Sequence, residues 1–347
     1  GLSENYYHFE TEFLGQDFII KRFGTDGDME KAAGLLLKWD KDAEAIGLGN
    51  VKFPYGFGPR YLTKKHHHKL RELGAQIQTP VTIGSALRDV SFEWALRYIE
   101  YRFGNYFDNA RVLFLSGMNN YRIAKVISEF TDNLSFADPV IENGIPKFVN
   151  SLKDFESYAH GAHEVLQWVP SKRLTTSVMP IKAWNEYILR KAMQKADIIV
   201  APYYNFDGYF KNTGLEELGG KTIITSTVYD KRVAFLKEKG VDVIIDTTPK
   251  ILQQVVAPNV LEALIIAALG RKSDQVQPDD LLEIISEQKM DPRIVYPAGK
   301  PKRVNRFAFV IHPLSKEFLK KDKAVDVLAS FTPPAFLDAV EKVIAYA

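Results

Sequence analysis

The chain has no cysteine at any of its 347 positions. It can therefore form no disulfide and no thiolate metal site, and it cannot carry an acyl group on a protein sulfur. No apolar run approaches the roughly eighteen residues that a membrane-spanning helix needs. The first residues, GLSENYYHFETEF, lack the charged-then-apolar layout of a signal peptide. These absences favour a cytoplasmic protein with no membrane span.

A large excess of either charge is also missing. The chain has 45 basic and 43 acidic residues, a net charge of +2. This balance gives no electrostatic reason to expect nucleic acid or an anionic membrane as a partner. The 46% apolar and 25% charged residues are typical of a globular protein. A chain of this length can bury a sizeable core and most often forms two domains.

The order of the predicted elements indicates an α/β fold in two units. Residues 6–13 and 17–23 alternate like the strands of a hairpin, and Asp28 stands where a helix cap is expected. Ser91 is a candidate cap for a helix ending at Phe103. Beyond that helix, strands and helices alternate as in a doubly wound parallel sheet. We expect an N-terminal α/β domain (1–104), a Rossmann-like domain (105–272), a helix and linker (273–302) and a further region (303–347).

The segment Arg111–Asp138 is the most informative part of the chain. It contains an apolar run, a turn with Gly117, a helical stretch and a second apolar run that ends in an acid. This order is typical of a nucleotide-binding β-α-β unit, in which the turn holds phosphate and the acid binds ribose. Only one glycine of the GxGxxG pattern is present. The segment therefore predicts either a bound NAD or NADP, or a turn that has lost its ligand.

Polar residues at the predicted strand ends are the candidate cofactor contacts. Asn119 is a candidate helix cap, Arg122 a candidate phosphate partner, and Asp138 either a ribose ligand or a turn acid. Because parallel strands end at one edge, we expect Ala201–Asp207, Thr225–Thr227 and Asp246–Thr248 to form one pocket facing the loop Asn50–Tyr61. The full set of cofactor candidates is Ser116, Gly117, Asn119, Asn120, Arg122, Asp138, Asn205, Thr225 and Thr227.

Several strings within residues 6–272 resemble a bacterial family labelled quinate/shikimate 5-dehydrogenase-like. They are TEFLGQDFIIKRFGTDGD (11–28), AIGLGNV (45–51), GPRYLT (58–63), TPVTIGSAL (79–87), GGKTIITSTV (219–228), LKEKGVDVIIDTTP (236–249) and APNVLEALIIAALG (257–270). The resemblance implies a shikimate-dehydrogenase-like first domain, a Rossmann-like second domain and an NAD(P)-linked oxidoreductase.

The resemblance also suggests catalytic and substrate residues. Shikimate dehydrogenases transfer a proton through a Lys–Asp pair whose sequence surroundings are absent here. Lys64 or Lys65 with Asp89 is the nearest substitute, and a solvated surface is the alternative for these lysines. Substrate contacts are expected at Tyr55, Arg60, Thr79, Ser85 and Asp207. The loop aromatics Phe53, Tyr55 and Phe57 could line an apolar pocket or cover the core.

The segments RFAFVIHPLS (306–315) and FTPPAFLDAVEKVIAYA (331–347) resemble the opening of long-chain acyl reductases, which make fatty aldehydes from acyl thioesters. The nucleophilic cysteine and glycine-rich cofactor loop of those enzymes are absent. The resemblance implies the N-terminal part of a larger acyl-reductase-like dehydrogenase, with a reductase domain as partner and a homo-oligomer as a further possibility. The rival interpretation is a non-catalytic module that binds a small ligand or a partner and accompanies the reductase.

Two histidine groups raise the question of a metal. Consecutive helical residues point about 100° apart, so His66–His68 cannot converge on one ion. His160 and His163 have a spacing that would allow a shared ligand, but no Glu-x-x-His pattern supports them. We expect no bound metal.

Overall fold

The computed structural model describes residues 6–49, 65–166, 179–203, 206–248, 250–251 and 254–299. The chain divides into two compact units, Gly1–Lys300 and Pro301–Ala347. All helices and strands given below belong to the first unit. Among the described residues, no helix combines the length and apolar character that crossing a membrane requires.

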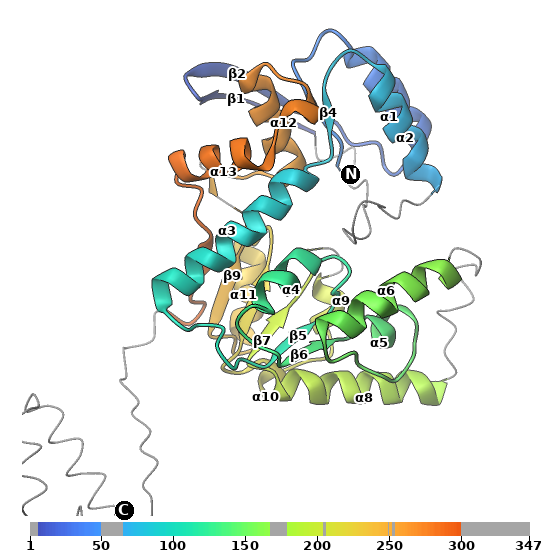
Figure 1. The fold of residues 1–347 in the computed structure, drawn as a ribbon, viewed down its shortest axis with the longest axis vertical. Helices are drawn as coiled ribbons and strands as arrows, with labels where there is room; N and C mark the ends of the chain where they lie inside the picture. Colours follow the sequence, from blue (N-terminus) through green and yellow to red (C-terminus); the bar gives the residue numbers. More distant parts are fainter. Residues whose placement is uncertain are drawn as a thin grey trace, which may run out of the picture. The chain divides into compact units, whose positions relative to one another are not determined.

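A mostly parallel sheet lies in the lower half of the view in Figure 1, with helices packed around it. Its strand order is β12-β9-β8-β7-β5-β6, and only β12 runs antiparallel to its neighbour. The strands are β5 (Val112–Phe114), β6 (Leu134–Phe136), β7 (Ile198–Val200), β8 (Thr222–Thr225), β9 (Val243–Asp246) and β12 (Arg293–Val295). The inner strands are short apolar runs because both of their faces are buried. The predicted α/β class is confirmed.

Helices cover both faces of this sheet, and alternate strand residues point to each side. On one face Val112 and Phe114 pack with α3, α4 and α6. On the other face Leu113 packs with α8, α9, α10 and α11. These helices are α3 (Ser85–Phe103), α4 (Tyr121–Ile127), α6 (Leu152–Leu166), α8 (Met179–Lys195), α9 (Phe206–Phe210), α10 (Leu215–Leu218) and α11 (Asp230–Glu238). A short helix, α5 (Asp138–Glu142), follows β6.

The N-terminal elements begin with the predicted hairpin. Strands β1 (Tyr7–Phe13) and β2 (Gln16–Arg22) pair antiparallel, and Leu14 and Gly15 between them both have positive φ, as a tight hairpin turn requires. Asp28 caps α1 (Met29–Trp39) as predicted, since its carboxylate accepts from two first-turn N–H groups. The remaining elements are β3 (Ile46–Gly47), α2 (Lys65–Gln76) and β4 (Val81–Thr82), with β3 and β4 parallel.

Two helices from late in the sequence complete the core of these N-terminal elements. Helix α12 (Pro258–Leu269) and helix α13 (Pro278–Glu287) bury apolar residues against Phe13 and Leu87. The approach is close, because a Cβ on Gly84 would lie 2.3 Å from the backbone nitrogen of Asn259. The expected Rossmann-like domain (105–272) therefore includes a helix, α12, that packs with the expected N-terminal domain (1–104). Short elements β10 (Lys250–Ile251), β11 (Gln254–Val255) and a 3-10 turn η2 (Ser273–Gln275) flank α12.

Two local predictions were wrong. The stretch expected to be a linker contains β12, which pairs with β9. Helix α3 begins at Ser85 behind Gly84, so Ser91 is a buried residue inside the helix and caps nothing. The signal for the true start was Gly84, whose φ of +75° ends the preceding extended segment.

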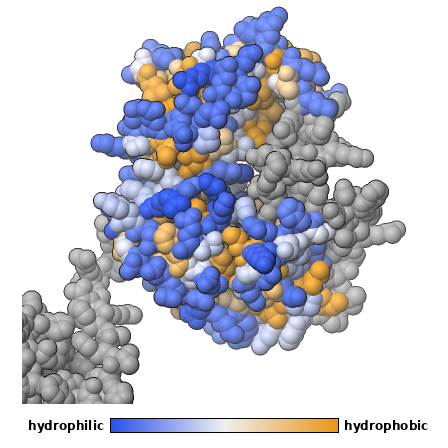
Figure 2. All heavy atoms as spheres, viewed as in Figure 1, coloured by the Kyte–Doolittle hydropathy of each residue, from blue (hydrophilic) through white to orange (hydrophobic). Residues whose placement is uncertain are grey.

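Hydrophilic residues cover much of the face in Figure 2 where α3 and α4 lie in Figure 1.

Candidate functional site

The carboxyl ends of the parallel strands meet at one edge of the sheet. Hydrogen bonds continue past the strands there: the N–H of Leu115 donates to Val200 O, that of Ala201 to Ile224 O, and that of Thr247 to Thr225 O, each at 2.9 Å. In an open α/β sheet this edge is where ligands bind. Asn205 and the loop 50–61, expected at the same place, lie outside the described residues.

The turn after β5 binds a carboxylate of the chain itself. The backbone N–H of Gly117 donates to Asp138 Oδ2 at 2.7 Å, and that of Met118 donates to Oδ1 at 3.0 Å. Burial raises the pKa of Asp138 to about 7, against the lowering effect of these two bonds. The two donors that were expected to face a phosphate thus face Asp138, which lies fully inside the protein.

Aromatic rings fill the space beside this turn. Phe136 stacks on Phe114 with ring centroids 4.9 Å apart, and on Phe155 of α6 with centroids 4.1 Å apart. A Cβ on Gly117 would lie 2.4 Å from Phe136 and 2.6 Å from Phe155. The glycine is therefore required by the packing of these rings, whatever else the turn binds.

Neighbouring candidates also make contacts within the protein. Asn119 Nδ2 donates to Ser116 Oγ at 2.7 Å, and Asn120 Nδ2 donates to Ser116 O at 2.9 Å. Asn119 does not cap α4 as expected. The N-cap position of α4 is occupied by Asn120, whose side chain makes no capping hydrogen bond. Arg122, the expected phosphate partner, forms an ion pair with Glu93 of α3.

The turn after β8 is organised by a second buried acid. Asp246 accepts from the N–H groups of Val228 and Thr248, each at 3.1 Å, and pairs with Arg293 of β12 at 3.1 Å. Burial raises the pKa of Asp246, while these bonds and Arg293 oppose the rise. Thr227 has a φ of +57°, which a β-branched residue rarely adopts, and its N–H donates to Thr248 Oγ1 at 2.9 Å.

Thr225, a cofactor candidate, lies at the start of the same turn and is almost fully buried. Its hydroxyl has no hydrogen-bond partner among the described residues. A buried hydroxyl without a partner is unusual in native proteins.

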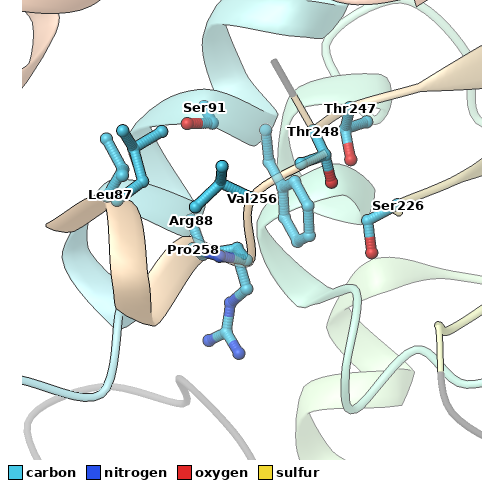
Figure 3. Close-up of a pocket in the computed structure, with 10 residues that line it drawn as sticks. Leu87, Arg88, Ser91, Ser226, Thr247, Thr248, Val256 and Pro258 are labelled. Atoms are coloured by element: carbon cyan, nitrogen blue, oxygen red, sulfur yellow. The ribbon is translucent and has the colours of Figure 1, made fainter. Parts of the chain in front are cut away.

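A small cavity of about 30 Å³ lies between this edge and α3 (Figure 3). It has room for about one water molecule or a methyl group. In the close-up, the guanidinium of Arg88 points away from the labelled threonines. The lining residues are Leu87, Arg88, Ser91, Phe92, Ser226, Thr247, Thr248, Val256, Pro258 and Leu261.

Only one residue of the candidate catalytic pair Lys65 and Asp89 has a described side chain. Asp89 is the fifth residue of α3, and its Oδ1 lies 3.5 Å from Arg88 Nη2. Burial raises the pKa of Asp89, and Arg88 and Arg122 oppose the rise. Lys65 is the first residue of α2, and its side chain lies outside the described ones. A Lys–Asp pair therefore remains a prediction.

Of the substrate candidates, the structure describes three. Thr79 is buried and its hydroxyl accepts from the N–H of Lys41 at 2.9 Å, so it joins two N-terminal segments. Ser85 is the first residue of α3, and Asp207 is exposed on α9. Tyr55 and Arg60 lie outside the described residues.

Sequence reasoning missed one buried acid near the cavity. Glu262 of α12 accepts from the N–H of Leu87 at 2.6 Å and from the hydroxyl of Thr82. Burial raises its pKa, against the effect of these bonds. Its carboxylate caps the first turn of α3 from a different helix. The available signal was a lone acid inside the apolar run NVLEALIIAAL. In the part of the chain that is described, no cluster of His, Asp or Glu could hold a metal.

Comparison with known proteins identifies a family without giving it a role. No curated protein and no solved structure matches the chain. Residues 1–94 match a domain of unknown function, DUF8753. Residues 86–297 match a second domain of unknown function, DUF8754, over well more than half of the 347 positions. The chain therefore belongs to the DUF8754 family.

Proposed function

We propose that the chain is a non-catalytic α/β module that binds a small ligand and accompanies a reductase domain. One observation carries the proposal: the N–H groups of Gly117 and Met118, where a dinucleotide phosphate would bind, are already held by Asp138. Phe136 and Phe155 pack against the same turn. A dinucleotide in the usual position would have to displace a buried carboxylate and two stacked rings.

The ligand is proposed to lie at the carboxyl edge of the sheet. Counted along the chain, β6-β5-β7-β8-β9 has the order 2-1-3-4-5. This is the flavodoxin-like order of doubly wound sheets, with its switch point between β5 and β7, and it supports the proposal of a doubly wound second domain of the Rossmann-like kind. The cavity beside Ser226 and Thr248, closed by α3, supports binding at this edge.

The reductase partner is inferred from the resemblance of residues 306–315 and 331–347 to acyl reductases. Because the chain has no cysteine, it cannot form the cysteine acyl-enzyme of those reductases. The proposal includes a cytoplasmic location. It also includes assembly as a homo-oligomer and the absence of a bound metal. Purified chain incubated with acyl-CoA and NADPH is expected to release no aldehyde.

A second candidate is an NAD(P)-linked oxidoreductase. The strand-turn-helix arrangement of β5 and α4, together with the resemblance over residues 6–272, favours it. This candidate requires Asp138 to leave the turn and bind ribose when the cofactor arrives. The two candidates therefore differ in what Asp138 contacts.

Titration calorimetry with millimolar NAD and NADP separates the two candidates. The module is expected to give no binding heat with either dinucleotide. Binding by the wild-type chain that weakens at least tenfold in Asp138→Asn, but not in the control Asp207→Asn, would establish the oxidoreductase instead. Asp207 suits the control because it is exposed on α9.

A further inference from the structure

Arg232, in the first turn of α11, lies against two aromatic rings at the ligand edge of the sheet. Its guanidinium carbon is 4.2 Å from the ring centroid of Phe206 and 5.3 Å from that of Tyr203. Both aromatic residues follow β7. A guanidinium stacked in this way can still donate hydrogen bonds in its own plane.

The positive charge of Arg232 has no carboxylate beside it. Its Nη1 donates to Ser226 O at 3.4 Å and Thr227 O at 3.3 Å, and its Nη2 donates to Tyr203 O at 3.4 Å. These bonds are long and their acceptors are neutral. No described carboxylate lies within 4.0 Å, whereas Arg122, Arg190 and Arg293 each have one. Burial lowers the pKa of Arg232, although Asp207 opposes this.

The turn that holds Arg232 is strained. Thr227 has a φ of +57°, a conformation that costs a β-branched residue on the order of 1–3 kcal/mol. In this conformation the carbonyls of Ser226 and Thr227 both face the same Arg232 nitrogen. Backbone strain of this kind is concentrated at functional sites.

Tyrosines and a second arginine stand near this guanidinium. Tyr203 and Tyr229 are 46% and 50% exposed, respectively. Tyr7 at the base of the hairpin is 38% exposed and lies under the guanidinium of Arg22, 5.7 Å away. Burial raises the pKa of Tyr229, Tyr203 and Tyr7 add to the rise, and Arg232 and Arg22 oppose it.

We propose that Arg232, Tyr203 and Tyr229 bind a small molecule that carries an anionic group beside a planar ring. Three of the five N–H groups of the Arg232 guanidinium face backbone carbonyls, which leaves Nε–H and one Nη2–H as a pair of donors for a carboxylate or a phosphate. The exposed tyrosines provide ring faces for stacking and hydroxyls for hydrogen bonds. This inference rests on the proposed function and names the chemical class of its ligand.

Four probes separate the two parts of this recognition: phenyl phosphate, benzoate, inorganic phosphate and phenol. Calorimetry on the full chain is expected to show millimolar or tighter binding of at least one of the two ring-bearing anions. Inorganic phosphate and phenol, which have only the charge or only the ring, are expected to bind at least tenfold more weakly. Comparing phenyl phosphate with benzoate tells which anion the site prefers.

Variants test the role of Arg232. Arg232→Gln is expected to lose at least tenfold in affinity for the preferred probe, and Arg232→Lys, which keeps the charge without the planar donors, to lose less. Arg102→Gln is the matched control, because Arg102 also lies over two rings, those of Tyr98 and Phe103. It is expected to bind like the wild-type chain. Circular dichroism and thermal unfolding confirm that each variant is folded.

Three outcomes would overturn the site: no binding of any probe, equal binding of inorganic phosphate and phenyl phosphate, or wild-type affinity in folded Arg232→Gln. These outcomes are distinguishable from failure of the proposed function. That function fails if NAD or NADP binds in a manner that depends on Asp138, which is measured with different ligands and a different variant.

Discussion

Two turns on the same edge of the sheet are each held by a buried aspartate, but the surroundings of the two carboxylates differ. The turn after β5 is held by Asp138, and the turn after β8 is held by Asp246. Each acid stands at the carboxyl end of the next strand in the sequence: Asp138 just after β6, and Asp246 as the last residue of β9. Each accepts hydrogen bonds from backbone N–H groups. Asp246 has a counter-ion in Arg293, whereas Glu142 near Asp138 raises the pKa of Asp138 further. The first turn thus contains a buried acid without a neutralising partner, and the second contains a buried ion pair.

The surroundings of the two turns differ as well. Phe136 and Phe155 press against Gly117 of the first turn, while Ser226 of the second turn lines a cavity. The comparison teaches that one buried acid can occupy a turn that other proteins leave for a ligand. Its counterpart three strands along leaves the edge accessible. The predictions below test each side of this contrast.

The largest expected effect is at the ion pair of the second turn. Arg293→Met removes the cation beside Asp246, which is 0% exposed. Leaving a buried carboxylate unpaired costs about 3–5 kcal/mol, so the free energy of unfolding in urea is expected to fall by that amount. Arg271→Met, which breaks the more exposed pair with Asp280, should cost less than about 1 kcal/mol. Equal losses in the two variants would contradict the contrast.

The first turn should make stability depend on pH. The pKa of Asp138 is raised from 3.8 to about 7 in the folded protein, so the folded state retains a proton that the unfolded state releases between these values. The resulting stability is fully present below about pH 4 and is lost as the pH rises to 7, in total on the order of 4 kcal/mol.

Asp138→Asn removes this contribution. The free energy of unfolding of the wild-type chain, minus that of the variant, should therefore fall steadily from pH 4 to pH 7. Urea denaturation at several pH values measures it. A difference that stays constant across this range would show that Asp138 titrates normally.

Packing at the first turn should give the next largest effect. In Gly117→Ala the new methyl group would lie 2.4 Å from Phe136, so the stacked rings must move. Such overpacking typically costs about 1–3 kcal/mol. Gly34→Ala is the control, because that helical position has nothing within 4 Å and alanine should stabilise the helix by about 1 kcal/mol. An unchanged thermal midpoint in Gly117→Ala would mean that the rings leave room at the turn.

The smallest effect is expected at the strained residue of the second turn. Thr227→Gly relieves a left-handed conformation that costs about 1–2 kcal/mol, while glycine costs about 0.5–1 kcal/mol in the unfolded chain. The net change should be a gain near 0.5 kcal/mol. Thr11→Gly, in the ordinary strand β1, should instead lose stability. A loss in Thr227→Gly as large as in the control would mean that Thr227 contributes contacts that outweigh its strain.

Local chemistry made several elements predictable. The hairpin follows from residue alternation and Gly15, the start of α1 follows from Asp28, and the inner strands follow from their apolar runs. These signals lie within a few residues of what they predict. The prediction that the strands end at one edge of the sheet followed from their parallel order alone.

The roles of individual side chains depended on distant partners. Asp138, 21 residues after Gly117, fits either a ribose ligand or a turn acid in the sequence, and only the fold brings its carboxylate to the N–H groups of Gly117 and Met118. Arg293 meets Asp246 across 47 positions, and Glu262 meets Leu87 across 175. Arg232 gave no motif in the sequence, because its ring contacts and the lack of a described carboxylate within 4.0 Å appear only in the folded chain.

The dependence of the first hundred residues on α12 and α13 has a consequence for synthesis on the ribosome. Phe13 and Leu87 share a core cluster with Leu261 of α12 and Ile285 of α13, whose buried residues make up most of that cluster. At about 5–20 residues per second, roughly ten to fifty seconds separate the synthesis of the hairpin from that of α12. During that interval the N-terminal elements have no complete core to fold around. The N-terminal elements are therefore synthesised well before α12 and α13, the helices that complete their core.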